Sequence, residues 1–512
     1  MRRFRQISLL QRPDFIVFFV VLCVSSAFAL YSTRFHHWFL IPVSMCGLLV
    51  MREAIDWVMG RRDLYDPLGL FGVYATFFFF FAPLLHVAWD YWMWEVVPPP
   101  DWRDWLGWMA VLNITAILAF RASYSFFFLA LPLRSSTTSW QIDFRLFPVV
   151  VGTALLISAL LQAGVYVHLG GLSGYIAAFH TGEEWPHIDP MAGMGPLFMI
   201  SESFPIVFAL ACLMYMRRSG KVVTLLQLSV ALPCFFALQM LFGGLRGSRL
   251  NTVEILFWTV GAVHYLLRRL SRQFMLAGAL LMVAFMWAYA FYKEGGDLTT
   301  AFEGGNKREE INKTSHRSVQ GLILGDFARS DVQAHVLYKW ATDNHDFTYG
   351  WGRTYLKAAA LMVPQRFLPA GAVNKSTLGT ELIWGPGTYT PGMLFSTRIY
   401  GLAGETILNF GPLPIPLAFA CFGFLLSRLT LWIQNLDPND ARMFFVPFLT
   451  YLCAIWVVGG DSDNVVFIAI KNGFVSTVIV LMTTVRIRRV RLRTVATLIR
   501  REAPSHASAH SC

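Results

Sequence analysis

The chain has 512 residues, of which 55% are hydrophobic and 14% are charged, and its mean hydropathy is +0.51. This composition excludes a water-soluble fold and indicates a protein that is dissolved in a lipid bilayer. The formal charge of +11 does not indicate nucleic-acid binding, because the basic residues form short clusters between apolar runs. Six of the seven cysteines lie within apolar runs and none has a paired spacing, so the sequence predicts neither a disulfide framework nor a metal site.

Windows of about 20 mostly apolar residues, the length that a membrane span requires, occur at twelve places in the sequence. They begin near Phe15, His37, Leu68, Trp105, Leu146, Pro196, Val222, Thr252, Gln273, Gly404, Met443 and Val465. The first window follows several arginines and lacks a clear small-residue cleavage site, so we interpret it as a retained signal-anchor helix. The predicted fold is an all-α polytopic membrane protein with about twelve transmembrane helices.

The distribution of Lys and Arg between these windows predicts the orientation of the chain. If the N-terminus is cytoplasmic, the loops and termini on that side carry 25 Lys and Arg residues. The short loops on the opposite side carry four, which are Arg34, Arg103, Arg246 and Arg249. Because basic residues concentrate on the cytoplasmic side of membrane proteins, we expect both termini in the cytoplasm. Loops longer than about 60 residues escape this rule, so the basic residues of the long loop do not count against it.

Four regions follow from this topology. They are an N-terminal membrane bundle of about nine spans (1–292), a large extracytoplasmic loop containing short helices (293–403), a C-terminal bundle of about three spans (404–485) and a basic cytoplasmic tail (486–512). The loop mixes aromatic residues with Gly and Pro, which is typical of an ordered segment that folds over the membrane. Within it, TYLKAAALMVPQRF, from Thr354 to Phe367, is predicted to form a short amphipathic helix in the membrane interface.

Charges that topology does not explain are the most informative ones. The segment GGLRGSRLN, residues 243–251, carries Arg246 and Arg249 at the predicted outer face, immediately before the eighth window. Two arginines three positions apart among glycines can bring guanidinium and backbone N–H groups around a phosphate or diphosphate. The following helix would direct its positive dipole end to the same place. A tight glycine turn whose arginines reach lipid headgroups accounts for the segment equally well.

A second group of charges lies in RIYGLAGETILNFGPLP, from Arg398 to Pro414. Glu405 and Asn409 are four residues apart and therefore share one helix face at the start of the tenth window. A carboxylate there requires a partner, for which Arg398 or an arginine of GLRGSR is the candidate. Paired with arginine, Glu405 is structural; unpaired in an apolar pocket, it has a raised pKa and can act as a base.

Five further ionisable residues lie inside or beside the windows. Glu202, Glu254 and Lys471 are the main ones within spans. Asp461 and Asp463 form an acidic turn that suits metal binding, ion pairing or helix capping, and capping is the default interpretation.

Three segments carry a family resemblance: GLRGSR before a helix, the stretch from Gly352 to Pro369 (GRTYL to VPQRFLP), and GETILNFG from Gly404 to Gly411. With the multi-span topology and the large outward loop, they resemble the O-antigen and exopolysaccharide repeat-unit polymerases of the Wzy type. The resemblance implies a glycosyltransferase of the bacterial cytoplasmic (inner) membrane that needs no metal or other cofactor. In that family a growing glycan leaves its undecaprenyl-diphosphate carrier for the terminal sugar of an incoming lipid-linked oligosaccharide. The implied partners are this substrate, the bilayer, a flippase and chain-length regulator proteins, with no nucleic acid.

The resemblance suggests roles for the charged residues. Arg246 and Arg249 would hold the diphosphate by electrostatic preorganisation, and Arg353 and Arg366 from the long loop would close over it. The acceptor hydroxyl requires a base, for which Glu405 is the first choice. The other candidate bases are Glu381 and His335, and the remaining substrate-binding candidates are Tyr355, Arg398 and Asn409.

Two other functions stay open. An O-antigen ligase or another lipid-linked-sugar glycosyltransferase would need a similar apparatus with a different acceptor. A secondary transporter or flippase belongs to a different class, and Glu202 close to Pro205 is compatible with the interrupted helix of such a protein. Internal repeats, which are common in transporters, are not evident between the two halves of the sequence.

Overall fold

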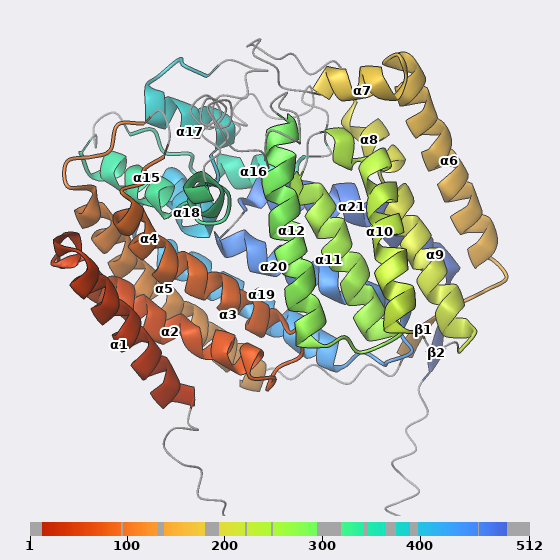
Figure 1. Cartoon of the computed structure of the whole chain (residues 1–512), viewed down its shortest axis with the longest axis horizontal. Helices are drawn as coiled ribbons and strands as arrows, with labels where there is room; N and C mark the ends of the chain where they lie inside the picture. The colour runs from red at the N-terminus through yellow and green to blue at the C-terminus, as the bar shows by residue number, and fades with distance from the viewer. Residues whose placement is uncertain are drawn as a thin grey trace, which may run out of the picture.

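The computed structural model describes residues 13–93, 96–130, 138–179, 194–220, 223–246, 249–293, 319–342, 347–361, 363, 375–389, 398–458 and 460–488. These residues form a helical bundle with a single two-stranded sheet (Figure 1). Both ends of the described chain, Pro13 and Arg488, lie at the same end of the bundle, which we call the terminal end. The opposite end, called the loop end, holds α15 (Ser330–Thr342), α16 (Arg353–Ala359), α17 (Lys375–Trp384) and α18 (Gly401–Phe410).

The first hydrophobic core is built mainly by the N-terminal helices. These are α1 (Pro13–Tyr31), α2 (Leu40–Val58), α3 (Pro67–Thr76), α4 (Ala82–Trp89) and α5 (Trp102–Ala130), with the 3-10 turn η2 (Thr33–Phe35) after α1. A π-helical segment, η3 (Phe77–Phe81), joins α3 directly to α4. Side chains of α15, α18 and α19 (Ile415–Gln434) complete this core, and α19 packs along α5.

The second hydrophobic core belongs to the middle of the chain and its C-terminal helices. The middle segments of this core are α6 (Phe147–His168), α9 (Phe204–Arg218), α10 (Leu225–Phe242), α11 (Arg249–Leu266) and α12 (Arg272–Lys293). A third, smaller cluster joins the end of α6 to α7 (Gly171–Phe179), α8 (Gly195–Ser201) and η4 (Gly244–Arg246). The C-terminal elements η7 (Ala441–Phe445), α20 (Val446–Val458) and α21 (Ser462–Thr483) pack into the second core. The C-terminal helices therefore lie between the two groups of earlier helices and join the two cores (Figure 1).

A short antiparallel ribbon at the terminal end was not predicted from the sequence. β1 (Thr138–Ile142) precedes α6 and pairs with β2 (Thr484–Arg488), which continues directly from α21. The aromatic ring of Trp140 on β1 lies 5.0 Å from the guanidinium carbon of Arg486 and also of Arg442. The ribbon therefore gives some of the basic residues near the end of the chain specific partners, in addition to any interaction with lipid.

Nine helices of the described chain are long and apolar enough to cross a membrane. They are Pro13–Tyr31, Pro67–Trp89, Trp102–Ala130, Phe147–His168, Gly195–Arg218, Leu225–Phe242, Arg272–Tyr289, Ile415–Gln434 and Ser462–Thr483. The predicted windows near His37, Thr252 and Met443 are also helical, as α2, α11 and α20. However, α2 and α11 carry several polar or charged residues, and α20 has only 13 residues.

The structure corrects the prediction for the tenth window. Glu405 and Asn409 do not lie at the head of the spanning helix, because α18 ends at Gly411 and the span α19 begins separately at Ile415. Gly411 has a φ of +80°, a conformation that glycine adopts without strain, and two prolines follow before α19. The break allows every residue of α18 except Phe410 to be buried.

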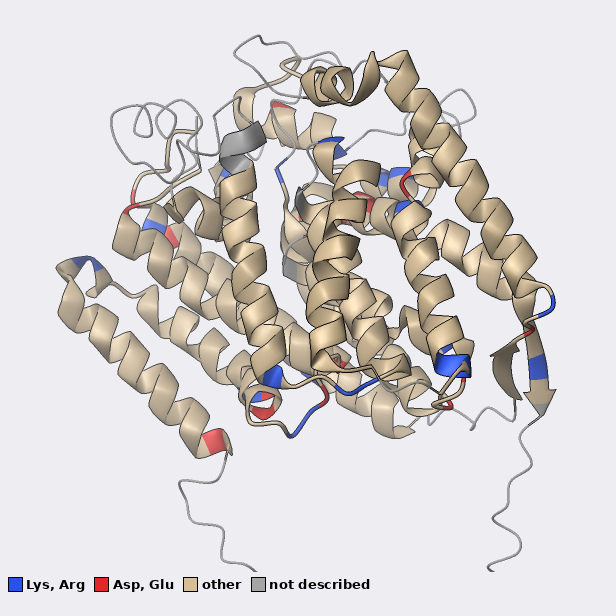
Figure 2. Ribbon diagram, turned by 45° about the vertical axis from the view of Figure 1, so that its right-hand side comes forward, with Lys and Arg blue, Asp and Glu red and all other residues tan. Residues whose placement is uncertain are grey.

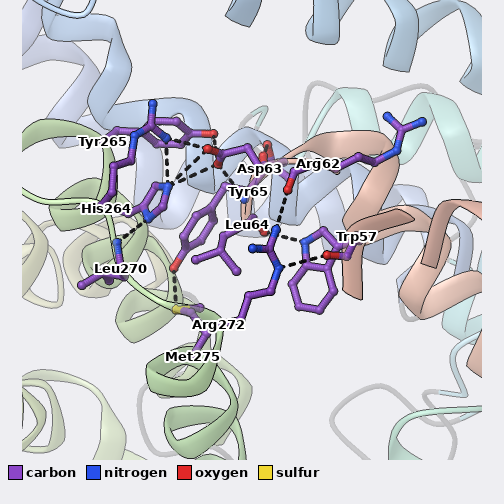
Figure 3. Close-up of polar contacts among 12 residues, drawn as sticks. Trp57, Arg62, Asp63, Leu64, Tyr65, His264, Tyr265, Leu270, Arg272 and Met275 are labelled. Atoms are coloured by element: carbon purple, nitrogen blue, oxygen red, sulfur yellow. Dashed lines mark hydrogen bonds and ion pairs between the residues drawn. The ribbon is translucent and has the colours of Figure 1, made fainter. Parts of the chain in front are cut away.

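At the terminal end, the α2–α3 turn is fastened to the region between α11 and α12 (Figure 3). The carboxylate of Asp63 accepts hydrogen bonds from the hydroxyl of Tyr265 (3.0 Å) and the guanidinium of Arg269 (2.6 Å). Nδ1 of His264 accepts a hydrogen bond from the backbone N–H of Leu270, and its Nε2 lies 3.3 Å from Asp63 and 2.9 Å from the guanidinium of Arg269. These contacts join two turns that are about 200 residues apart in the sequence.

We predict that Asp63→Ala lowers the unfolding temperature of the detergent-solubilised protein. Loss of these hydrogen bonds corresponds to about 1 kcal/mol, allowing for the partial exposure of the carboxylate. Asp56→Ala is the matched control, since Asp56 makes a single ion pair with Arg61, and it should change the unfolding temperature less.

The contribution of Asp63 to the stability of the fold should depend on pH. Burial alone would raise the pKa of Asp63, but the hydrogen bonds from His264 and from the backbone of Tyr65, with the charge of Arg269, lower it to about 2. Because this value lies below the unfolded pKa of about 3.9, the stabilisation is complete above pH ~4 and disappears as the pH falls toward ~2. An equal difference in unfolding temperature between wild type and Asp63→Ala at pH 7 and at pH 2.5 would contradict this assignment.

Candidate functional site

A buried polar cluster lies at the loop end, around the carboxylate of Glu405 on α18. The hydroxyl of Thr354, on α16, donates to Oε1 of Glu405 (2.9 Å). Ser462, the first residue of α21, donates twice, from its backbone N–H to Oε2 (2.9 Å) and from its hydroxyl to Oε1 (2.5 Å). Asn409, one turn further along α18, donates to the hydroxyl oxygen of Thr354 (2.8 Å). Together, Glu405, Thr354, Asn409 and Ser462 are called the Glu405 cluster.

The local sequence explains why α16 approaches α18 so closely. A Cβ added at Gly350 would lie 2.5 Å from Oδ1 of Asn409, so only glycine fits there. Gly352 adopts a φ of +79° at the start of α16 and donates its N–H to the same Oδ1 (2.9 Å). The sequence prediction of an interfacial helix from Thr354 to Phe367 is therefore corrected for its first part. Thr354 is buried against α18, although the end of the predicted helix lies outside the described residues.

Glu405 is held by hydroxyl and amide donors and not by arginine in the contacts that the structure describes. Neither Arg398 nor Arg246 has the predicted role of its ion-pair partner, because Arg398 lies over the ring of Trp384 and Arg246 pairs with Glu202. Burial and the nearby charge of Asp461 raise the pKa of Glu405 to about 7, and the donors from Ser462 and Thr354 oppose this rise. A carboxyl group in this state can accept or donate a proton near neutral pH.

An ion-pair network lies directly beside the Glu405 cluster. The ammonium group of Lys375, on α17, contacts the carboxylates of both Asp461 and Asp463, the latter at 3.2 Å. Oδ1 of Asp461 accepts hydrogen bonds from the backbone N–H groups of Tyr400 (2.8 Å) and Gly401 (2.7 Å). The default interpretation of Asp461 as a helix cap is wrong, since its side chain makes no capping bond to α21. Its role is to join α17, α18 and α21.

A second polar cluster lies within the bundle and consists of Glu202, Arg246 and Lys471, which we call the Glu202 cluster. Nε of Arg246 is 3.0 Å from Oε1 of Glu202, and Nζ of Lys471 is 2.6 Å from Oε2. The side chains of Glu202 and Lys471 are only 2% and 8% exposed, and that of Arg246 is 20% exposed. Glu202 and Lys471 both belong to helices that are apolar enough to span a membrane, so this is a buried ionic site in an apolar environment.

Neighbouring side chains support the Glu202 cluster. The guanidinium carbon of Arg246 lies 4.2 Å from the ring centroid of Phe198 on α8. Next to Lys471, the side-chain amide of Asn472 donates to Glu254 (2.9 Å) and to Asn251 (3.1 Å) on α11. Residues from α8, α11, α21 and η4 thus converge, and the GLRGSR segment supplies one of the two cations.

Helix α21 connects the two clusters. Ser462 belongs to the Glu405 cluster and Lys471 to the Glu202 cluster, and nine residues of helix separate them by about 13 Å. In Figure 2, charged residues lie at both ends of the bundle and also among the helices in the half nearest the loop end. Both clusters therefore involve α21, but nine positions are about two and a half turns, so Ser462 and Lys471 face opposite sides of this helix.

The other predicted site residues lie apart from these contacts or support them indirectly. Arg353 uses its guanidinium to bind the backbone oxygens of Gly350 (3.0 Å) and Tyr349 (3.1 Å), which fixes the start of α16. The hydroxyl of Tyr355 lies 3.4 Å from that of Thr406, on α18. Glu381 accepts a hydrogen bond from the backbone of Gly387, and His335 is buried with its ring 6.3 Å from that of Trp92. The side chain of Arg249 and all of Arg366 lie outside the described residues.

Three residues of this site, Lys375, Thr354 and Ser462, were not predicted from the sequence as site residues. Nothing in the sequence separates Lys375 from the other basic residues of the long loop, because its partner Asp461 is 86 residues away. Thr354 and Ser462 are unremarkable hydroxyl residues until α16, α18 and α21 are placed together. The spacing of Glu405 and Asn409 was the useful signal, and the structure confirms that both side chains lie on the buried face of one helix.

One further group could hold a metal ion by geometry. Among the described residues, His37, Asp101 and Asp104 place one potential ligand atom each within 4.8 Å of one another. Arg103 already engages the carboxylate of Asp101, and the indole of Trp38 engages that of Asp104. Hydrogen bonds and ion pairs therefore account for the arrangement of this group.

Comparison of the chain with protein-family models, with curated proteins and with solved structures finds no match. The functional conclusion therefore rests on the two clusters and on the helices that hold them.

We predict that Glu405→Gln changes the pH dependence of stability. Glutamine can place its oxygen toward the N–H of Ser462 and its amide toward the hydroxyl groups, so the fold should persist. Because the pKa of Glu405 is raised to about 7 from an unfolded value of about 4.3, the wild type loses stability as the pH rises through this interval. The unfolding temperature of Glu405→Gln minus that of the wild type should therefore be higher at pH 8 than at pH 5.

Glu381→Gln is the control for this measurement, because Glu381 lies at the end of α17 and contacts only a backbone amide among the described interactions. Its effect should be the same at both pH values. The assignment fails if Glu405→Gln also shifts the unfolding temperature equally at pH 5 and pH 8.

Proposed function

We propose that this protein is a membrane glycosyltransferase that polymerises lipid-diphosphate-linked oligosaccharide repeat units into O-antigen, capsule or exopolysaccharide. The observation that carries the proposal is the pairing of two sites on α21. At one site, two cations, Arg246 and Lys471, lie beside Glu202. At the other site lies Glu405, a carboxyl group that can exchange a proton near neutral pH. Transfer of a glycan from a lipid diphosphate requires both functions.

The chemistry follows from these roles. An acceptor hydroxyl attacks the anomeric carbon of the lipid-linked glycan, and its proton passes to the carboxylate of Glu405. The bond between the anomeric carbon and the phosphate oxygen breaks, and its electron pair leaves with the diphosphate. Arg246 and Lys471 stabilise the negative charge that develops there, in an environment where water does not screen it. The reaction conserves atoms and needs no oxidant, reductant or nucleotide.

In this proposal, residues at the loop end position the base for the acceptor hydroxyl. Thr354 and Ser462 orient the carboxylate of Glu405, and Arg353 fixes the start of the helix that carries Thr354. Tyr355 and Asn409 belong to the same packed unit, whereas Glu381, His335 and Arg398 remain secondary candidates. Arg249 and Arg366 are proposed to reach the diphosphate as well. Movement of α16 would give the acceptor access to Glu405, since the carboxylate is fully buried.

The proposed topology gives the reaction its location. Twelve helices span the bacterial cytoplasmic membrane, with α2, α11 and α20 added to the nine most apolar ones, and the loop end faces away from the cytoplasm. Both termini are cytoplasmic in this arrangement, as their common position at the terminal end allows. The substrate is an undecaprenyl-diphosphate-linked oligosaccharide, which a flippase supplies from the cytoplasmic side, and chain-length regulators are the expected protein partners.

Two single variants test the proposal in cells that depend on this protein for their polymer. Removing a base costs about 10²–10⁴-fold in rate, and removing one charge-stabilising donor costs about 10²–10³-fold. Glu405→Gln and Arg246→Ala should therefore both abolish long-chain polymer, detected by gel electrophoresis, while the tagged protein still accumulates in the membrane.

Arg121→Ala is the matched control, because Arg121 also pairs with a glutamate, Glu53, at 2.6 Å but lies on α5, outside both clusters. It should leave polymer length unchanged. Full-length polymer in both Arg246→Ala and Arg249→Ala would exclude the diphosphate assignment, and full activity of Glu405→Gln would leave that residue a structural role. A deletion that strands polymer on its lipid carrier, and not single repeat units, would identify a ligase.

A transporter or flippase is the second candidate, and one observation favours it. Glu202 lies between α8 and α9, where a helix long enough to span the membrane is interrupted, and two cations from other elements meet it there. Interrupted helices with charges inside the membrane are typical of secondary transporters. The polymerase proposal accounts for the same charges and also gives a role to Glu405, which a transporter does not require.

A further inference from the structure

Among Glu202, Arg246 and Lys471, the positive charges exceed the negative charges by one. A further carboxyl group, Glu254 on α11, interacts with the charge of Lys471 and accepts a hydrogen bond from Asn472. The carboxylate of Glu202 bridges Arg246 and Lys471, which approach opposite oxygens at 3.0 Å and 2.6 Å. Inside an apolar bundle, an ionic cluster is stable only when its charges and hydrogen-bonding groups are matched. Two cations around one carboxylate form a site for a group with two negative charges, of which Glu202 supplies one.

The surroundings of this cluster are those of an anion site. The backbone at Gly243 passes so close that an added Cβ would lie 3.3 Å from Oε2 of Glu202, and one at Gly244 would lie 3.1 Å from the hydroxyl oxygen of Thr252. That hydroxyl is buried and has no hydrogen-bond partner in the described structure. An unpartnered buried hydroxyl beside Gly244, in the segment that carries Arg246, fits a ligand with several acceptor oxygens.

A third element faces the same place. Tyr175, on α7, is buried, and burial together with the negative charge of Glu202 raises the pKa of its hydroxyl group, while the charge of Arg246 lowers it. The phenol therefore stays protonated and available as a donor close to both residues. Donors from α7 and α11 are thus added to the cations from η4 and α21.

Glu202 lies at a break between two helices, where its carboxylate can move away from Arg246 and Lys471. It directly follows α8, which ends at Ser201, and Ser203 separates it from the start of α9 at Phe204. Interruptions of this kind are the positions at which helices change direction with little loss of backbone hydrogen bonding. A change at Glu202 and Ser203 would withdraw the carboxylate without moving Arg246 or Lys471.

We propose that Glu202 is an internal anion that occupies the diphosphate-binding site in the ligand-free protein, and that a lipid diphosphate displaces it from Arg246 and Lys471. The identity of the ligand rests on the proposed function. A diphosphate that links a lipid to a glycan has two negative charges, which the two cations neutralise, so a retained Glu202 carboxylate would leave one charge in excess. Glu202 thus lowers the affinity for the ligand, and when the site is otherwise empty it neutralises one of the two positive charges.

The test is direct binding of farnesyl diphosphate to the full-length protein purified in detergent, with no acceptor present. Farnesol is the control ligand, because it has the same lipid chain without phosphate. If Glu202 competes for the site, Glu202→Gln should bind farnesyl diphosphate at least about 10-fold more tightly than wild type. Arg246→Met and Lys471→Met should each weaken binding at least about 10-fold.

The matched control is Glu53→Gln, which removes a glutamate from another arginine pair and should not change the dissociation constant. Glu202→Asp provides a second variant that preserves the charge, and its shorter side chain should give an affinity between those of wild type and Glu202→Gln. The inference is overturned if Glu202→Gln binds as wild type does or more weakly, or if farnesol binds as tightly as farnesyl diphosphate.

The binding experiment is separate from the proposed function. If the protein polymerises repeat units but Glu202→Gln binds no more tightly, only the displacement of Glu202 is wrong. If the affinities change as expected but no polymer is formed, the anion site stands and the polymerase proposal is wrong.

Discussion

The structure depends on one constraint, which is that the polar and ionised groups inside an apolar bundle must satisfy one another. Helix α21 meets this constraint twice. At its first residue, the N–H and hydroxyl of Ser462 hold the carboxylate of Glu405, and about 13 Å further along, Lys471 neutralises Glu202. Each contact joins α21 to helices from distant parts of the sequence. The same groups that hold the bundle together are therefore the ones available for chemistry.

Sequence patterns predicted the general character of the fold, because apolar length and charge distribution reflect the bilayer directly. They also selected Glu405 with Asn409, because the two share a helix face, and they singled out Glu202, Glu254 and Lys471 because ionisable residues are rare in apolar helices. They did not predict that α18 ends at Gly411, because the apolar pattern continues through the break. The pairing of Lys375 with Asp461 was equally hidden, because it depends on how three loop-end helices meet.

The Glu202 cluster is compatible with both candidate functions. A buried carboxylate between two cations suits a transporter that exchanges ions, and it suits an enzyme that holds a diphosphate. The distinguishing feature is Glu405, whose hydrogen bonds come from neutral donors and whose neighbour Asp461 favours retention of a proton. Transport through the Glu202 cluster gives this second site no task, whereas glycosyl transfer requires a group that accepts the proton of the acceptor hydroxyl.

The most direct measurement uses the purified protein in liposomes that have no ion gradient, supplied with a synthetic undecaprenyl-diphosphate-linked repeat unit. The account predicts that repeat units are joined into longer glycans, with release of undecaprenyl diphosphate, and that Glu405→Gln liposomes form none. Movement of the lipid-linked unit across the bilayer without any change in glycan length would contradict the account and identify a transporter.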